Sequence, residues 1–168
     1  MVFSAELPVH RAVVPSQREG GGVLPGPVVL RRLAAATADL ARAALDDVAV
    51  AGGQADERLP LALDVSGYCL HRTEILARHA RLADPRTRPS VSTDLEPARL
   101  LHTLVEQSGW RGPTVLACSD GVDDDTLRTW AQGILSSGAT TSALLGRVTV
   151  DEEDTFTIDV GALTTRER

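Results

Sequence analysis

The sequence contains no lysine and no asparagine, only two cysteines, and few aromatic side chains. Since lysine is absent, all 17 basic residues are arginine, an imbalance typical of codon or genome bias. Cys69 and Cys118 are too few for a disulfide framework, and no CxxC or HExxH spacing points to structural zinc. With aromatics at 3%, the core must consist of Leu, Val, Ala and Ile, which suits packed helices and parallel strands.

Long apolar runs and signals for export are also missing. No stretch approaches the about 20 apolar residues that a membrane span needs. The opening MVFSAELPVH has neither the basic start nor the apolar stretch of a signal peptide, so we expect a cytoplasmic protein without a membrane partner. The formal net charge of -6 argues against nucleic-acid binding.

The length of 168 residues, with 43% hydrophobic and 24% charged residues, predicts one globular domain. We expect residues 1–26 to form an arm and loop, in which the apolar stretch at Ala12 to Val14 is a short strand or part of a flexible arm. Residues 162–168 are expected to form a frayed tail.

Apolar periodicity divides the rest of the chain into helices and strands. Thr93 or Asp94 is the expected N-cap of the third helix and Gly109 its C-cap. The order of elements predicts an α/β fold: a mixed, mostly parallel five-stranded sheet flanked by helices, with one antiparallel pair at the end. The predicted helices cover residues 27–48, 69–82, 93–109 and 126–138, and the predicted strands cover residues 59–65, 114–119, 140–150 and 154–163.

The stretch from Gly112 to Val148 resembles the nucleophile region of the β-ketoacyl synthases, the thiolase-fold condensing enzymes of fatty acid and polyketide synthesis. In that family a Gly-Pro enters a strand that ends at the active-site cysteine, and a helix follows. A Ser-Gly then leads to a strand that ends in a Gly-Gly-Val-like turn. The matching landmarks here are Gly112-Pro113, Ser137-Gly138 and Gly146-Arg147-Val148.

The resemblance extends over residues 27 to 150. Residues 30–47 look like the family's first long helix, and LPLALDVSG looks like its second strand. The resemblance therefore implies a single, complete half of a thiolase-like fold, equivalent to the N-terminal half of a ketosynthase.

Two departures from the family pattern bear on catalysis. An alignment without gaps places Gly121 at the nucleophile position, whereas a gapped alternative places Cys118 to Gly121 on the family's Cys-Ser-Ser-Gly-like turn. The family's two catalytic histidines lie in a C-terminal half that this sequence does not contain. The resemblance thus implies no catalytic residue, and no condensing activity of this chain alone.

The residues themselves leave the role of Cys118 open. A thiolate between a strand end and a helix N-terminus can be an activated nucleophile. A free cysteine is otherwise often a buried small hydrophobe, and the nearby aspartates would disfavour the thiolate. Asp120 and Asp123 to Asp125 lack calcium-loop spacing and are interpreted as helix-capping residues. No carboxylate or cysteine completes a metal site around His71, His79 and His102, so neither metal nor cofactor is expected.

Three functions remain as hypotheses. The first is a non-catalytic, chain-length-factor-like subunit that binds or scaffolds in polyketide or fatty acid biosynthesis, with itself or a ketosynthase-type subunit as partner. The alternative is a small acyl-transfer enzyme with Cys118 as the acyl-accepting nucleophile. The third is an unrelated α/β binding module.

Two surfaces are candidates for partners. The helix over residues 126–138 carries an apolar stripe, and with the strand from Thr114 to Cys118 it is the expected homodimer interface. Arg72, Arg78 and Arg81 are candidates for docking an acidic acyl carrier protein, although a solvated helix face with Glu74 beside Arg78 explains them as well. The expected interface residues are Leu127, Trp130 and Ile134, with Ala131 and Leu135 on the same stripe.

Overall fold

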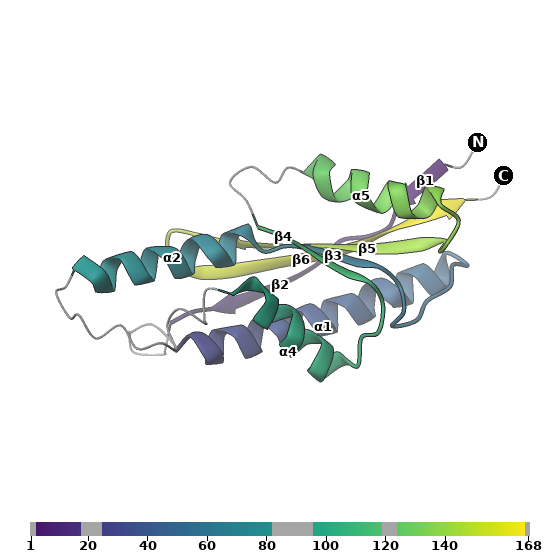
Figure 1. The fold of residues 1–168 in the computed structure, drawn as a ribbon. Helices are drawn as coiled ribbons and strands as arrows, with labels where there is room; N and C mark the ends of the chain where they lie inside the picture. The colour runs from purple at the N-terminus through teal and green to yellow at the C-terminus, as the bar shows by residue number, and fades with distance from the viewer. Residues whose placement is uncertain (1–2, 18–24, 82–95, 119–123, 167–168) are drawn as a thin grey trace.

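The computed structural model describes residues 3–17, 25–81, 96–118 and 124–166. Its elements follow the predicted order, except that the opening segment forms two strands rather than one strand or an arm (Figure 1). The elements are β1 (Phe3–Glu6), β2 (His10–Pro15), α1 (Gly26–Val50), β3 (Leu61–Asp64), α2 (Ser66–Arg81), α4 (Pro97–Ser108), β4 (Thr114–Ala117), α5 (Asp124–Ser136), β5 (Ser142–Val150) and β6 (Thr155–Arg166).

The strands form a mixed sheet in the order β1-β6-β5-β3-β4, and β2 also pairs with β6. Strand β3 runs parallel to β4 and β5, whereas β6 is antiparallel to β5, β1 and β2. The α/β class and the mixed sheet flanked by helices are therefore confirmed. The expectation of a mostly parallel sheet is wrong: three of the five described pairings are antiparallel, because the N-terminal segment adds two antiparallel pairings to the expected one.

The short strand expected at residues 12–14 is confirmed as part of β2, whereas the alternative of a flexible arm and the frayed tail are wrong where the structure describes those residues. Strand β6 is 12 residues long, so β1 and β2 pair with successive parts of one of its edges. The segment after residue 162 stays in the sheet because Thr164 is buried and shares a 3.0 Å hydrogen bond with the Ser142 hydroxyl. On the other edge of β6, Thr164 pairs with Ser142 of β5, so the C-terminal part of β6 has a strand on each side.

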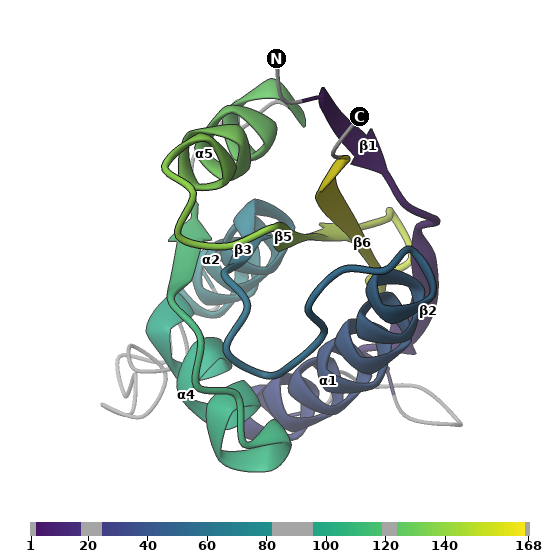
Figure 2. The same cartoon turned by 90° about the vertical axis from the view of Figure 1, so that its right-hand side faces the viewer.

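Helices α1 and α4 cover one face of the sheet, and α5 lies over the opposite face (Figure 2). Helix α1 has proline in its first turn, as expected, and buries its apolar side against β5 and β6. Helix α4 ends at Gly109, whose φ of 71° is left-handed, so the predicted C-cap is confirmed. Its N-cap is Glu96 instead of Thr93 or Asp94, which lie outside the described residues.

Helix α2 lies beyond the end of β3 and packs against the free part of β5. Strand β3 pairs with β5 only as far as Arg147, which leaves the last part of β5 for α2 to contact. The approach is close: a Cβ at Gly67 would lie 2.5 Å from the Val148 carbonyl oxygen and 2.8 Å from the Thr149 Cα. Glycine at position 67 is thus what lets α2 sit on the β5 backbone. Of the helices that the structure describes, none combines the length and the apolar character of a membrane span.

His71 of α2 is buried beside the turn that joins β5 to β6. Its ring packs edge-on against Phe156 at a centroid distance of 4.8 Å, and its Nε2 lies 3.4 Å from Asp154 Oδ1. Burial lowers the pKa of His71; the carboxylates of Asp154 and Glu74 oppose that shift, whereas Arg72 and Arg78 reinforce it. The imidazole is therefore held in its neutral form.

This burial should make the fold sensitive to mild acid. Because the pKa of His71 is lower in the folded chain than in the unfolded one, the unfolded chain gains the proton first. Stability should therefore fall as the pH drops below about 6.5, by up to about 1.4 kcal/mol per pH unit from this group. Urea unfolding at pH 7.5 and 5.5 should show a smaller loss for His71→Leu than for the wild type. Equal losses in both proteins would place the acid sensitivity elsewhere.

Candidate functional site

Cys118 lies at the carboxyl end of the edge strand β4. It follows Ala117, whose carbonyl accepts a 2.8 Å hydrogen bond from the Val65 N–H at the end of β3, and its side chain is exposed. Gly121, the alternative at the nucleophile position, lies outside the described residues, as do Ser119, Asp120 and Asp123. The carboxyl ends of β3 and β4 thus meet at the position that sequence reasoning singled out.

The structure brings Cys69 to the same place, which sequence reasoning missed. Cys69 lies in the first turn of α2, where its N–H donates a 3.0 Å hydrogen bond to the Val65 carbonyl. Burial, a hydrogen bond with the Cys118 side chain and the nearby Asp64 carboxylate raise the pKa of Cys69 to about 12. Cys69 is therefore a protonated thiol at neutral pH.

A buried ion pair supports this end of the sheet. The Asp64 carboxylate is nearly inaccessible to solvent; it accepts 3.0 Å hydrogen bonds from the Ser66 N–H and from Arg147 Nε. The ion pair therefore joins β3 to β5, and the same Asp64 carboxylate caps the N-terminus of α2. The sequence places Asp64 inside an apolar strand, and a charged residue within such a run indicates that it has a partner in the fold.

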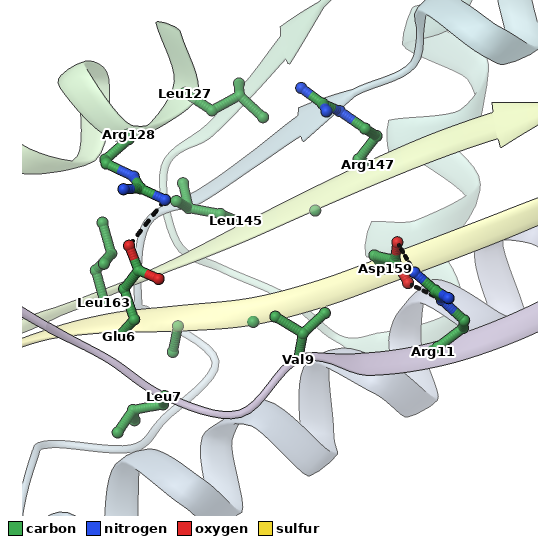
Figure 3. A pocket seen from close by; sticks show the side chains of 13 residues that line it. Glu6, Leu7, Val9, Arg11, Leu127, Arg128, Leu145, Arg147, Asp159 and Leu163 are labelled. Carbon is green, nitrogen blue, oxygen red and sulfur yellow. Dashed lines mark hydrogen bonds and ion pairs between the residues drawn. The ribbon is translucent and has the colours of Figure 1, made fainter. Parts of the chain in front are cut away.

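A pocket of about 440 Å³ lies between α5, the sheet and the crossing from β1 to β2 (Figure 3). Leucines from α5, β5 and β6 provide apolar walls. Arg11 contacts Asp159 at 2.6 and 2.9 Å, and Arg128 contacts Glu6 at 2.8 Å. Since Arg147, which also lines the pocket, contacts Asp64, each of these three arginines already has a carboxylate partner. The pocket therefore offers no excess positive charge to an anionic ligand.

The apolar stripe of α5 packs mainly on the chain's own sheet. Leu127 is only 6% exposed, and Ala131 and Leu135 are buried against Ala143 and Leu163. Only Trp130 and Ile134 remain half-buried. The stripe was predicted, but much of it is covered within the chain rather than left for a partner.

Trp130 and Ile134 lie on the flank of α5 that faces away from β1. Arg128 reaches Glu6 of β1, and at about 100° per residue Trp130 and Ile134 project from the opposite side of the helix. Helix α5 also contacts β3, and β4 is the strand next to β3. On β4, Leu116 packs into the α1 core, so Val115 points to the face that carries α5.

The three arginines proposed for carrier-protein docking do not share one surface. Arg72 is only 7% exposed. Arg78 is exposed and lies 3.9 Å from Glu74, and Arg81 is exposed as well. Only Arg78 and Arg81 are therefore accessible to a partner.

The comparisons with known proteins show a similarity in fold alone. No protein-family model matches the chain, and no curated protein matches it. Among solved structures, one chain of the complex between the ketosynthase ApeO and its chain length factor ApeC, from Xenorhabdus doucetiae, is similar in fold. The match has 12% identity and a TM-score of 0.47, and it covers 95% of this chain and 79% of that chain. This is a coarse likeness in overall fold.

Proposed function

We propose that the chain is a non-catalytic, ketosynthase-like binding or scaffolding subunit of polyketide or fatty acid biosynthesis, which associates with a second copy of itself through the edge of β4. The biosynthetic setting is supported by the sequence landmarks between Gly112 and Val148. The self-association is supported by one structural observation: among the described residues, β4 pairs on one side only, and exposed apolar surface lies beside it.

The backbone of β4 is arranged to receive another strand. Pro113 and Ala117 direct their carbonyls to β3, where they accept hydrogen bonds from Leu61 and Val65. Because neighbouring residues of a strand alternate, the backbone groups of Thr114 and Leu116 point away from β3. An unpaired edge of this kind is a template for pairing with a second chain. Identical edges most often meet across a two-fold axis.

Apolar side chains would add to that backbone pairing. Val115 is 36% exposed on the face that carries α5, and Trp130 and Ile134 are half-buried on the nearer flank of the helix. Covering them against the same groups of a second copy would remove apolar surface from water. Leu127 does not contribute, because its own sheet already covers it.

The surroundings of Cys118 favour binding over acyl transfer. Its described neighbour is the protonated thiol of Cys69, with the Asp64 carboxylate nearby. A neutral thiol and a negative charge do not activate a cysteine, which needs a base or a positive group. We therefore expect Cys118→Ala to keep its association, whereas the acyl-transfer alternative requires loss of function on the same change.

Substitution on β4 tests the interface. We expect a dimer in light scattering at micromolar concentration, and at least about tenfold weaker dimerisation for Val115→Arg, because two added charges would meet across the axis. Val13→Arg is the matched control, since Val13 is 62% exposed on β2 at the other side of the sheet. A monomeric wild type, or equal weakening by both changes, would contradict self-association through β4.

Two finer points remain predictions. Docking of an acyl carrier protein would depend on Arg78 and Arg81, and association with a ketosynthase-type subunit would use the same β4 edge. The cytoplasmic location expected from the sequence also stays a prediction.

A further inference from the structure

Two cysteines that are far apart in the sequence, Cys69 and Cys118, lie on segments that are both hydrogen-bonded to the backbone of Val65, the residue that follows β3. Val65 donates its N–H to the carbonyl of Ala117, which precedes Cys118, and accepts the N–H of Cys69 on its own carbonyl. These hydrogen bonds measure 2.8 and 3.0 Å. The Cys118 side chain is also close enough to Cys69 to help raise the pKa of the Cys69 thiol. The segments that carry both sulfur atoms are thus held together by the backbone, and not by the side chains alone.

We propose that Cys69 and Cys118 are a modification site, at which a peroxide-type oxidant converts the two thiols into an intramolecular disulfide. A disulfide needs its two Cα atoms about 4.4 to 6.8 Å apart, and the backbone hydrogen bonds through Val65 hold the two cysteines on adjacent segments. The proposal does not depend on the function proposed above.

Exposure assigns the order of the two steps. Cys118 is exposed and Cys69 is half-buried, so Cys118 meets the oxidant first. Its thiolate attacks one oxygen of hydrogen peroxide, the O–O bond breaks, and a sulfenic acid and hydroxide result. The sulfur of Cys69 then attacks the sulfur of Cys118. The S–S bond forms as the S–O bond breaks, and the Cys69 proton leaves with the oxygen as water. In sum, two thiols are oxidised and one peroxide is reduced to two waters.

The environment of Cys69 suits the resolving role. Because its pKa is raised from 9.0 to about 12, its thiolate population near pH 8 is about a thousandfold below that of an ordinary thiol. It therefore does not compete for the oxidant. Its contact with Cys118 offsets the low thiolate population in the second step, since the reaction is intramolecular.

The test uses the whole reduced chain treated with hydrogen peroxide at pH 8, then blocked with iodoacetamide and analysed by mass spectrometry. We expect the wild type to lose two hydrogens, to take up no alkyl group, and to yield a linked pair of peptides that contain Cys69 and Cys118. A dithiol reductant should reverse the change. In Cys69→Ser, the sulfenic acid of Cys118 should accumulate and react with dimedone. In Cys118→Ser, Cys69 should stay reduced.

A matched control keeps two thiols but moves one of them. Thr73 lies one turn beyond Cys69 in α2, is exposed, and donates its hydroxyl to the Cys69 carbonyl. The double variant Cys69→Ser/Thr73→Cys should form at least about tenfold less intramolecular disulfide than the wild type, because the second thiol no longer contacts Cys118. The proposal is overturned if this variant is linked as readily as the wild type. It is also overturned if both wild-type thiols remain open to alkylation, or if the disulfides join separate chains.

Discussion

Replacing Gly112 by alanine should destabilise the protein by about 3 kcal/mol or more, the largest effect we expect of any single methyl group added to this fold. A Cβ at this position would overlap the Leu59 carbonyl oxygen and lie 2.7 Å from both the carbonyl carbon and the oxygen of Arg58. These are backbone atoms, so no side-chain rotation relieves the overlap. The two segments are also held together by the hydrogen bond from the Gly112 N–H to the Glu57 carbonyl, at 2.9 Å.

Gly133 provides the control for that change. It lies in the exposed part of α5, and a Cβ there would meet nothing within 4 Å. Gly133→Ala should therefore stabilise the protein by up to about 1 kcal/mol, since alanine favours helix over glycine. Urea unfolding of both variants checks the pair. If both variants changed the free energy of unfolding by a similar amount and in the same direction, the close backbone contact would not be the reason why position 112 requires glycine.

Arg147→Met should cost on the order of 3 kcal/mol, because it leaves the Asp64 carboxylate buried without its charged partner. The Ser66 N–H also donates to that carboxylate, and one neutral hydrogen bond does not replace a guanidinium. Methionine keeps much of the aliphatic length of arginine, so the change reports mainly on the charge.

Two further variants separate the effect of the lost charge from the effect of changed packing in Arg147→Met. Arg11→Met breaks an ion pair of the same type with Asp159, but the Arg11 side chain is 67% exposed, so the expected cost is much smaller than that of Arg147→Met. Asp64→Asn/Arg147→Met should recover part of the loss, because no uncompensated charge stays buried. Equal unfolding free energies for Arg147→Met and Arg11→Met would mean that the burial of Asp64 does not matter.

Local patterns predicted most of the elements because each pattern lies within one segment. The spacing of leucine and alanine predicts α1 to within two residues at each end, and Gly109 terminates α4 as expected. The pairing of β1 and β2 with β6 depends on partners at the other end of the chain. For that reason the segment after residue 162 was expected to fray, although it is a strand.

The candidate site was predicted in part for the same physical reason. The position of Cys118 at a strand end follows from its own segment, and so does the apolar stripe of α5. The burial of Ala131 and Leu135 depends on Leu163 and Ala143, and whether Arg72 is exposed depends on how α2 packs. The contact of Cys69 with Cys118 required knowing that β3 and β4 are neighbours and parallel.

The pairing of β6 with β1 and β2 also has a consequence for synthesis on the ribosome. Arg11 and Asp159 form their contact across 148 residues of sequence, so the first strands made wait for the last strand of this segment before the described sheet can close. Pairing over such a distance is slow compared with helix formation, and α1 can form long before it. Strand β2, with the exposed Val13, is made long before β6, the strand it pairs with in the described sheet, so this apolar stretch stays unpaired with β6 for most of the synthesis of the segment.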